Sequence, residues 1–223
     1  MSNKVTVASI AVENYLKSLW QLGSENVSTA DLAQQLGVAP ASATKMVQRL
    51  TEKGLVLYVP YRGATLTSKG ELKALSVVRR HRLLETFLAK TLSLGHDQIH
   101  KEAENLEHAL SKELEDSISI FLNNPTRDPH GHPIPGPNGE IEIGDDLLLV
   151  NCPLGKAAIV TQIPDDSSEI LSWLEDKKIY PGSKIKLISN ESFEGGLTID
   201  CEGEIFQISS IIANSIYVSF MEL

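Results

Sequence analysis

Apolar positions follow two different periods along the 223-residue chain, first that of helices and later that of strands. Apolar side chains recur every three to four residues over Ala8–Leu22, and the same period returns in two shorter stretches, Thr29–Leu36 and Ala41–Lys53. Ser28, followed three residues later by Asp31, resembles a capping box at the start of the second of these stretches. The pattern therefore predicts three helices at the N-terminal end of the chain.

A β-hairpin is predicted directly after these helices. Two apolar and β-branched runs, Leu55–Pro60 and Ala64–Thr67, flank a Tyr-Arg-Gly turn. Helix, turn, helix and hairpin in this order indicate a winged helix-turn-helix domain over residues 1–70, whose second helix would enter the major groove of DNA. The small, hydroxylic or basic residues that we expect at the DNA surface are Ser28, Thr29, Ala39, Pro40, Ser42, Ala43, Thr44, Lys45, Arg49 and Arg62.

A second helical segment is predicted over residues 71–140. One helix should run from Ser68 to Leu94, and another should begin near Asp97. The apolar spacing continues after a possible break at Ser111. The segment ends in a stretch dense in Pro, Gly and Asn, which predicts a connector rather than a helix or strand.

The third segment, residues 141–223, changes to the period of strands. The stretch Glu169–Lys177 predicts a single helix among five short strands. Several short strands with few helices favour a small β-barrel, so the expected fold class is α+β. The predicted strands are Ala158–Ile163, Ser183–Ile188, Leu197–Cys201, Ile205–Ile208 and Tyr217–Phe220.

Composition and charge narrow the classes of protein to consider. The chain lacks an apolar run of about 18 residues and a signal-peptide pattern, and it has two cysteines, so we expect a cytoplasmic protein without a membrane partner or a disulfide framework. The net charge of −9 argues against a polyanionic partner. However, residues 40–82 hold nine Lys or Arg against two Glu, a local charge of +7 that favours DNA.

All six histidines lie between residues 81 and 132, close to several glutamates. Glu104, Glu107 and His108 have a spacing that would bring them together from one helical face. His81 and Glu85 form an i, i+4 pair on the preceding helix. Carboxylates and imidazoles without thiolates suit Mn(II) or Fe(II). The alternative is a solvent-exposed polar helix face, which is the more common explanation for any single pair.

Several motifs together resemble the diphtheria-toxin-repressor family of metal-dependent transcriptional regulators. They are HRLLE at His81–Glu85 and HKEAENLEH at His100–His108, following the winged domain. The stretches TKMVQRL and YRGATLTSKG are similar to the manganese-responsive branch, and DPHGHPIPG resembles the segment before the family's SH3-like barrel. The resemblance covers essentially the whole chain.

The resemblance implies a homodimeric repressor of metal-homeostasis genes. It would be formed by a winged helix-turn-helix domain, a helical dimerisation domain and a C-terminal SH3-like β-barrel, with a divalent metal as corepressor and a palindromic double-stranded operator as partner. One metal site would take Asn14, Glu104, Glu107 and His108. A neighbouring site would take His81, Glu85 and His100, with Asp128 and His130 of the connector or an acidic barrel residue such as Asp166 or Glu169.

Two positions depart from the family pattern. Asn14 stands where manganese-responsive relatives carry an acidic residue and iron-responsive ones a methionine. Glu104 stands where iron-responsive relatives carry a cysteine. Because a carboxylate is the harder donor, the sequence favours Mn(II), with Fe(II) as the alternative.

Two other functions are compatible with parts of the pattern. A metal-dependent hydrolase would also use carboxylates and histidines, but the chain has no HExxH motif, nucleophile elbow or phosphate loop, so we expect no enzyme. A DNA-binding regulator that responds to an organic ligand is the other alternative.

Overall fold

The computed structural model describes residues 7–92, 94–142, 144–165, 167–191 and 196–220. It divides into two compact units. The first comprises Met1–Leu84, Ala103–Phe121 and Pro135–Ile141, and the second comprises Glu85–Glu102, Leu122–Ile134 and Glu142–Leu223. The unit boundaries fall inside two helices, so the predicted domain limits at residues 70 and 140 stay a prediction.

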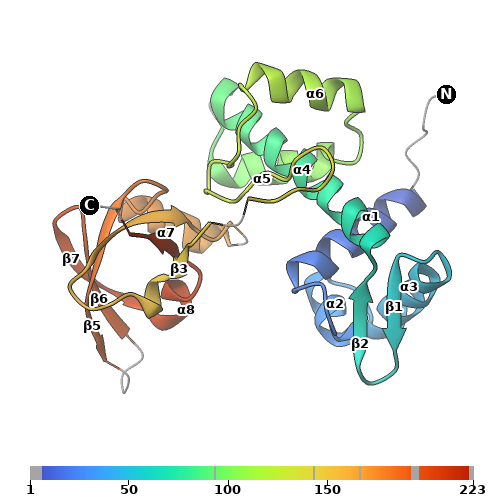
Figure 1. The fold of residues 1–223 in the computed structure, drawn as a ribbon, viewed down its shortest axis with the longest axis horizontal. Coiled ribbons are helices and arrows are strands. Elements are labelled where there is room, and N and C mark those ends of the chain that lie inside the picture. Colours follow the sequence, from blue (N-terminus) through green and yellow to red (C-terminus); the bar gives the residue numbers. More distant parts are fainter. Residues whose placement is uncertain (1–6, 93, 143, 166, 192–195, 221–223) are drawn as a thin grey trace. The chain divides into compact units, whose positions relative to one another are not determined.

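The N-terminal part of the first unit is the predicted winged helix-turn-helix, with three helices followed by a two-stranded antiparallel hairpin (Figure 1). The capping box at the second helix is present, since the Ser28 hydroxyl accepts the Asp31 N–H at 3.0 Å and donates to the Asp31 carboxylate at 2.7 Å. The elements are α1 (Val7–Gln21), α2 (Thr29–Gln35), α3 (Pro40–Glu52), β1 (Val56–Val59) and β2 (Gly63–Leu66).

One apolar core holds these elements together. The helices contribute side chains with no exposed surface, among them Leu16, Leu32 and Leu50. The hairpin closes on the same core through Ala64, and Gly63 at its turn is required because a Cβ there would lie 2.6 Å from the Asn26 backbone. The core therefore fixes the face of α3 that remains outside.

Three helices follow: α4 (Ser68–Thr91), α5 (His96–Leu106) and α6 (Lys112–Phe121). Helix α5 is shorter than expected because Ser111 caps α6 with its hydroxyl, which accepts the Leu114 N–H at 3.2 Å. The chain must leave the helical path between the two. Glu107 and His108 lie in the turn after α5, where the Glu107 N–H still bonds to the Ala103 carbonyl at 2.9 Å as in a helix, so Glu107 lies one turn after Glu104 and the convergence of the three side chains stays a prediction.

The second unit contains a six-stranded antiparallel sheet in the order β3-β8-β4-β5-β6-β7. The five predicted strands and the predicted helix are present. Three further elements, β3, the 3₁₀ helix η1 and α8, were not predicted because two to four residues are too few to show a period. The elements are β3 (Leu147–Leu148), η1 (Leu149–Asn151), β4 (Ala157–Gln162), α7 (Ser168–Asp176), β5 (Lys184–Glu191), β6 (Gly196–Cys201), β7 (Glu204–Ser209), α8 (Ser210–Ala213) and β8 (Tyr217–Ser219).

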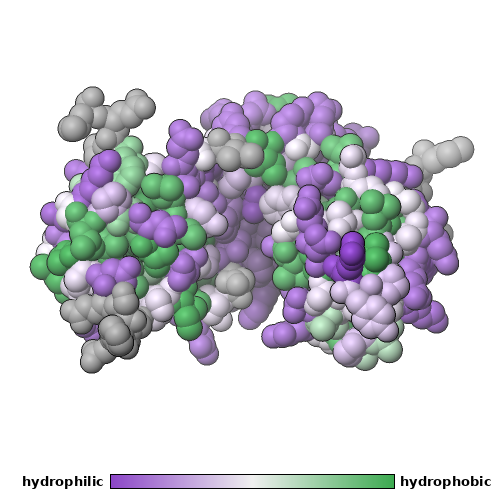
Figure 2. Space-filling view, turned by 60° about the horizontal axis from the view of Figure 1, so that its bottom comes forward, coloured by the Kyte–Doolittle hydropathy of each residue, from purple (hydrophilic) through white to green (hydrophobic). Residues whose placement is uncertain are grey.

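The sheet buries alternate side chains in a second apolar core. On β6, Leu197, Ile199 and Cys201 point inward and the residues between them are half-buried. Apolar surface is also visible on the outside of this unit (Figure 2). Among its large apolar side chains, Ile205 and Ile211 are 67% and 77% exposed. Among the described residues, no helix combines the length and the apolar character that a bilayer crossing needs.

Candidate functional site

The first cluster of candidate metal ligands lies where the turn after α5 meets α1. His108 Nδ1 lies 2.6 Å from an oxygen of Glu13, and Arg80 holds the same oxygen at 3.0 Å. A carboxylate only accepts, so Nδ1 is the donor in this contact, and Nε2 is the ring nitrogen that remains to bind a metal ion. Nε2 lies 3.4 Å from Oε1 of Glu107. A histidine oriented by a carboxylate in this way is typical of metal ligands.

Two further groups meet the other oxygen of Glu107. Nζ of Lys17 donates to Oε2 at 2.8 Å, and Nδ1 of His81 lies 2.7 Å from the same oxygen. The exposed fractions of Lys17, His81 and Glu107 are 8%, 4% and 2%. This cluster therefore joins α1, α4 and the turn after α5 through buried charged groups.

The acidic members of the cluster are ionised. Burial alone would raise the pKa of Glu107, but the hydrogen bond to His81 and the charge of Lys17 outweigh it, and the pKa lies below its ordinary value. Burial likewise opposes ionisation of Glu13, yet the hydrogen bond from His108 and the charge of Arg80 lower its pKa. Negatively charged carboxylates beside a neutral imidazole nitrogen are the donors that a divalent cation requires.

The other two predicted ligands of this site lie close to it in sequence but are less enclosed. Asn14 follows Glu13 on α1 and is half-buried. Glu104 is exposed and lies in the last turn of α5, one turn before Glu107. The role of Asn14 and Glu104 as metal ligands stays a prediction.

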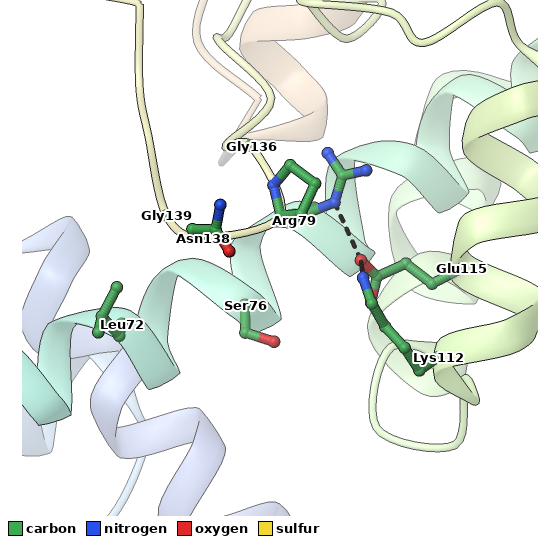
Figure 3. A pocket seen from close by; sticks show the side chains of 9 residues that line it. Leu72, Ser76, Arg79, Lys112, Glu115, Gly136, Asn138 and Gly139 are labelled. Carbon is green, nitrogen blue, oxygen red and sulfur yellow. Dashed lines mark hydrogen bonds and ion pairs between the residues drawn. The ribbon is translucent and has the colours of Figure 1, made fainter.

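A cleft of about 310 Å³ opens elsewhere in the first unit, between α4, α6 and residues 136–139 (Figure 3). Its cations already have partners. Arg79 donates to Glu115 at 2.9 Å and to the Pro135 carbonyl at 2.7 Å, and Lys112 lies 3.0 Å from Glu115. This network fastens α6 to α4, so we assign the cleft no ligand.

The second cluster lies in the second unit and is built by the connector. Asp128 Oδ1 accepts the backbone N–H groups of His130 and His132, each at 2.9 Å, which turns the chain back on itself. Gly131 between them is at φ +86°, and a Cβ there would lie 1.9 Å from the Thr161 carbonyl oxygen on β4. Only glycine permits this close approach. The connector is thus a fixed loop against the sheet.

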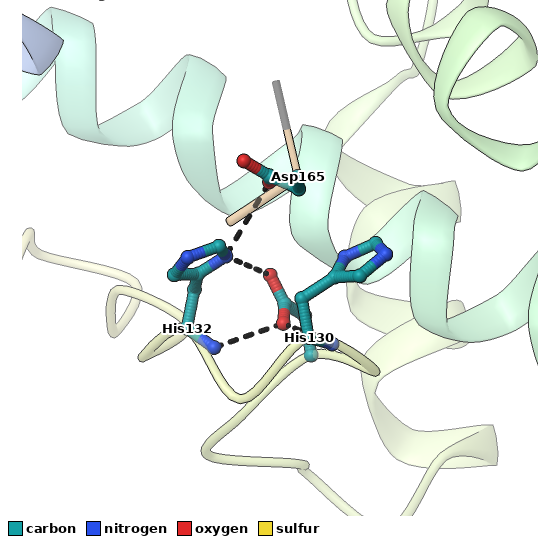
Figure 4. Close-up of side chains that lie close together, drawn as sticks. His130, His132 and Asp165 are labelled. Carbon is teal, nitrogen blue, oxygen red and sulfur yellow. Dashed lines mark hydrogen bonds and ion pairs between the residues drawn. The ribbon is translucent and has the colours of Figure 1, made fainter. Parts of the chain in front are cut away.

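This loop brings acidic and imidazole side chains together (Figure 4). His132 Nδ1 lies 3.4 Å from Asp128 Oδ2 and 3.3 Å from Asp165 Oδ2. Asp128, His130, His132 and Asp165 each offer a ligand atom within 4.8 Å of the others. Two carboxylates and two imidazoles in a buried place fit a divalent metal ion.

Helices α4 and α5 supply two more donors in the same unit. His100 Nδ1 lies 3.0 Å from Glu85 Oε1, and His130 Nδ1 lies 4.0 Å from Glu85 Oε2. Glu85 is fully buried. The predicted ligands Glu85, His100, Asp128 and His130 therefore lie in one unit. His81, one turn before Glu85 on α4, offers a ligand atom within 4.8 Å of those of Glu85 and His100, and it also faces Glu107.

Protonation in the second cluster is shifted by this crowding. Burial alone would lower the pKa of His132. The hydrogen bonds to Asp128 and Asp165 outweigh burial, and the pKa rises to about 9. Burial opposes ionisation of Asp165, yet the bond to His132 lowers its pKa to about 2. For His130, burial is the larger effect and the pKa is lowered. A metal ion would therefore have to displace a proton from His132.

Four residues of the two clusters were not selected from the sequence. Glu13 and Lys17 lie one turn apart on α1. His132 was not among the ligands predicted from the sequence. For the barrel we expected Asp166 or Glu169, but the structure places Asp165 at the cluster. Asp166 lies outside the described residues, and Glu169 is exposed in the first turn of α7. Only the HGH spacing in the connector was a signal that the sequence could have provided.

The predicted DNA surface is largely exposed. Ala39, Pro40, Ser42, Lys45, Arg49 and Arg62 are exposed, while Ser28, Thr29 and Thr44 are half-buried. The prediction that Ala43 lies at the DNA surface is wrong, because its side chain is fully buried in the core and cannot contact DNA. Thr44 donates its hydroxyl to the Pro40 carbonyl at 3.0 Å.

The basic stretch divides between surface and interior. Arg79 is buried against Glu115, Arg80 binds Glu13, and Arg82 lies over the Trp20 ring at 5.5 Å. These three arginines serve the fold, so they do not add to a DNA-binding face. The six exposed cations are Lys45, Arg49, Lys53, Arg62, Lys69 and Lys73.

Three domain families match successive parts of the chain. Residues 9–64 match "Iron dependent repressor, N-terminal DNA binding domain", and residues 67–136 match "Iron dependent repressor, metal binding and dimerisation domain". Residues 147–219 match the FeoA domain. The iron-dependent repressor IdeR of Mycobacterium tuberculosis is 31% identical over 208 residues, which cover 86% of this chain and 88% of the relative. The chain belongs to the iron-dependent repressor family.

Other relatives of the family agree. The diphtheria toxin repressor of Corynebacterium glutamicum is 29% identical over an alignment that covers 94% of this chain and 96% of that repressor. A structure described as a manganese-dependent transcriptional repressor in complex with manganese is 35% identical in sequence and superposes with a TM-score of 0.88. The superposition covers 94% of this chain and 100% of that structure's chain. The structure of the manganese regulator SloR has 31% identity, a TM-score of 0.81 and coverages of 94% and 98%.

These comparisons confirm the family and the fold class that the sequence predicted. The chain combines a winged helix-turn-helix DNA-binding domain, a helical dimerisation domain and a C-terminal SH3-like β domain, in a mixed α+β fold. Proteins of the iron-dependent repressor family are metal-dependent regulators of transcription.

Proposed function

We propose that this protein is a repressor of metal-homeostasis genes that binds a palindromic operator as a homodimer when it holds Mn(II). One observation carries the proposal. Glu13 of α1, inside the DNA-binding domain, orients His108 beside Glu107 in the turn after α5. A cation bound there would connect the DNA-binding domain to the helices that follow it.

The residues that would hold the ion are the buried donors of the two clusters. In the first cluster these are Glu107 Oε1 and His108 Nε2, with Glu104 and Asn14 as the expected additional ligands. In the second unit they are Glu85, His100, Asp128 and His130, to which the structure adds His132 and Asp165. When bound, the ion supplies two positive charges that hold these acidic groups together.

Donor chemistry supports manganese over softer metals. The candidate ligands are carboxylates, imidazoles and one amide, which suit Mn(II) and Fe(II). The two thiols lie elsewhere, in the core of the sheet, where burial raises the pKa of Cys152 and raises that of Cys201 to about 11. We therefore propose Mn(II) as the corepressor and Fe(II) as the alternative.

The functional effect is a coupling between metal binding and DNA binding. Glu107 and His108 after α5 and Asn14 on α1 would be held together by a bound ion, which would restrict α1 relative to this turn and leave fewer arrangements of the recognition helices, among them one that matches successive major grooves. A typical coupling makes operator binding about 5- to 150-fold tighter, and DNA must tighten metal binding by the same factor.

Operator affinity with and without Mn(II) tests the proposal. Fluorescence anisotropy with the protein's own upstream DNA should show at least fivefold tighter binding with Mn(II) than with a chelator. His108→Ala should remove this difference, whereas His96→Ala at the start of α5 should keep it. Equal affinities for the wild-type protein with and without metal would reject the corepressor role.

A further inference from the structure

Lys17 places an ammonium group among the candidate metal ligands of the first unit. Its Nζ lies 2.8 Å from Oε2 of Glu107 and 3.2 Å from Nδ1 of His81. All three side chains are buried. A lysine is rarely buried unless it is paired, and here both neighbours are groups that could otherwise bind a metal ion.

The carboxylate of Glu107 is divided between two sides of the cluster. Oε2 faces Lys17 and His81, and Oε1 faces Nε2 of His108 at 3.4 Å. Glu13 fixes the His108 ring from the far side through Nδ1. One side of Glu107 is therefore engaged by a cation that belongs to the chain, and the other faces a histidine nitrogen oriented for a metal ion.

Without the ammonium group, the Lys17 side would resemble a second ion site. It would offer a carboxylate oxygen and an imidazole nitrogen, the same two donor types as the His108 side. With Lys17 present, a second divalent ion would have to remove a buried ammonium from its carboxylate or remain close to it. Like charges at such short range repel strongly where water is largely excluded.

We propose that Lys17 is a built-in substitute for a second divalent cation, so that this centre binds a single metal ion on the His108 side of Glu107. The inference rests on the metal binding proposed above and concerns the number of ions and their affinity. The ammonium also neutralises part of the charge on Glu107. The single ion therefore binds more weakly than it would without Lys17, which adjusts the metal concentration at which the repressor responds.

Counting Mn(II) ions in the full-length protein tests this inference. The background carries Asp128→Asn, Asp165→Asn and Glu85→Gln, which remove the carboxylates of the other candidate ligand groups so that ions there do not contribute. Electron paramagnetic resonance during a Mn(II) titration distinguishes an isolated ion from an exchange-coupled pair. Circular dichroism checks that each variant keeps its helices.

Four proteins are compared in this background. With Lys17 in place, we expect one isolated ion at the first centre. Lys17→Glu replaces the ammonium with a carboxylate, so a coupled pair of ions should appear. Lys17→Met keeps the length of the side chain and removes the charge, so the first ion should bind about tenfold more tightly. Lys184→Met, which removes an exposed ammonium from β5, should leave affinity and ion number unchanged.

The outcomes separate this inference from the proposed function. A coupled pair with Lys17 in place would overturn the inference and leave the metal-dependent function standing. So would an unchanged affinity in Lys17→Met, the arm that remains informative if Lys17→Glu does not fold. Absence of any ion at the first centre with Lys17 in place would reject both.

Discussion

At the scale of single residues, metal affinity in this protein depends on groups that orient the ligands as much as on the ligands. Glu13 is the example in the first cluster. It holds Nδ1 of His108 at 2.6 Å and is itself held by Arg80 at 3.0 Å. The proton on Nδ1 leaves Nε2 as the nitrogen that can bind a metal ion. A carboxylate that the sequence did not identify thus decides which nitrogen of a predicted ligand is available.

Glu13→Gln should weaken Mn(II) binding at the first centre by about 10- to 100-fold, the usual effect of removing a partner that orients a ligand. The amide keeps the size of the side chain but lacks the charge that fixes the ring. Isothermal titration calorimetry of the metal-free protein measures the change. Glu25→Gln, at an exposed position before α2, is the matched control. An affinity equal to that of wild type would show that Glu13 has no orienting role.

His132 should make the stability of the metal-free protein depend on pH. Its pKa in the folded protein is about 9, above the ordinary value of 6.5. A group whose pKa is higher in the folded than in the unfolded protein stabilises the fold fully at a pH below the unfolded-state pKa. For His132 this stabilisation is lost as the pH rises from 6.5 to 9. We expect the melting temperature of chelator-treated wild type to exceed that of His132→Gln at pH 6 and to approach it at pH 9.

Thermal denaturation of both proteins across this range measures the difference. Because the two proteins share every other titrating group, their difference isolates His132. A difference that stays constant from pH 6 to pH 9 would contradict the assignment of the charge to the pair with Asp165. Mn(II) binding should also release protons near pH 7, since the ion requires neutral His132.

At the scale of elements, the winged domain presents α3 and the hairpin as a basic face. Burial of Ala43, Val47 and Leu50 turns the opposite side of α3 outward, and this side carries Lys45 and Arg49. The hairpin holds Arg62 at its exposed tip. The local positive charge predicted from the sequence is present, but three arginines of α4 are paired with Glu115, Glu13 and the Trp20 ring, and Lys69 and Lys73 of that helix remain exposed.

Arg49→Ala should weaken operator binding because it removes an exposed cation from α3. If Arg49 binds a phosphate, affinity falls by a similar factor for all sequences, and the slope of affinity against salt concentration decreases by about one. If it reads a guanine, the loss is about 1–3 kcal/mol and specific to the operator. Anisotropy titrations at several salt concentrations distinguish the two. Lys184→Ala on β5 is the control, and a variant that binds like this control would remove Arg49 from the DNA surface.

At the scale of the whole molecule, the family assignment implies a dimer through residues 67–136. Within this range, the C-terminal end of α6 exposes Ile120 and Phe121 to 69% and 64%. Two adjacent exposed apolar side chains in the part of the chain that matches the dimerisation domain make this end of α6 the surface where we expect the partner subunit. The pairing of Arg79 with Glu115 fastens α6 to α4, so a dimer formed through α6 would also position the helix that leads from the DNA-binding domain.

The double variant Ile120→Glu/Phe121→Glu should be a monomer, since two charges would be buried at the expected interface. Operator binding should fall at least tenfold, because a palindromic site needs two recognition helices. Light scattering coupled to gel filtration measures the mass. Leu154→Glu, a substitution at a 62% exposed position in the second unit, should remain dimeric. A dimeric double variant would place the interface elsewhere.

Much of the fold follows from the sequence, because the signals for it are local. Helical periods, the Ser28 cap and the hairpin turn each involve residues within a few positions of one another, and the structure confirms them. The sequence did not predict β3, η1 and α8, which have two, three and four residues and carry no repeat of apolar positions. The end of α5 was misplaced because the cap of the next helix, not the apolar spacing, decides it.

The sequence by itself determined the order of the elements, the family and the region in which metal ligands gather. Only the tertiary structure decided which groups meet there. Lys17 enters the cluster of Glu107 although 90 residues separate them, and Asp165 reaches His132 only because the connector folds against β4. The physical reason is that periodicity and capping act between neighbours in the chain, whereas the pairing of buried charges depends on how distant elements pack.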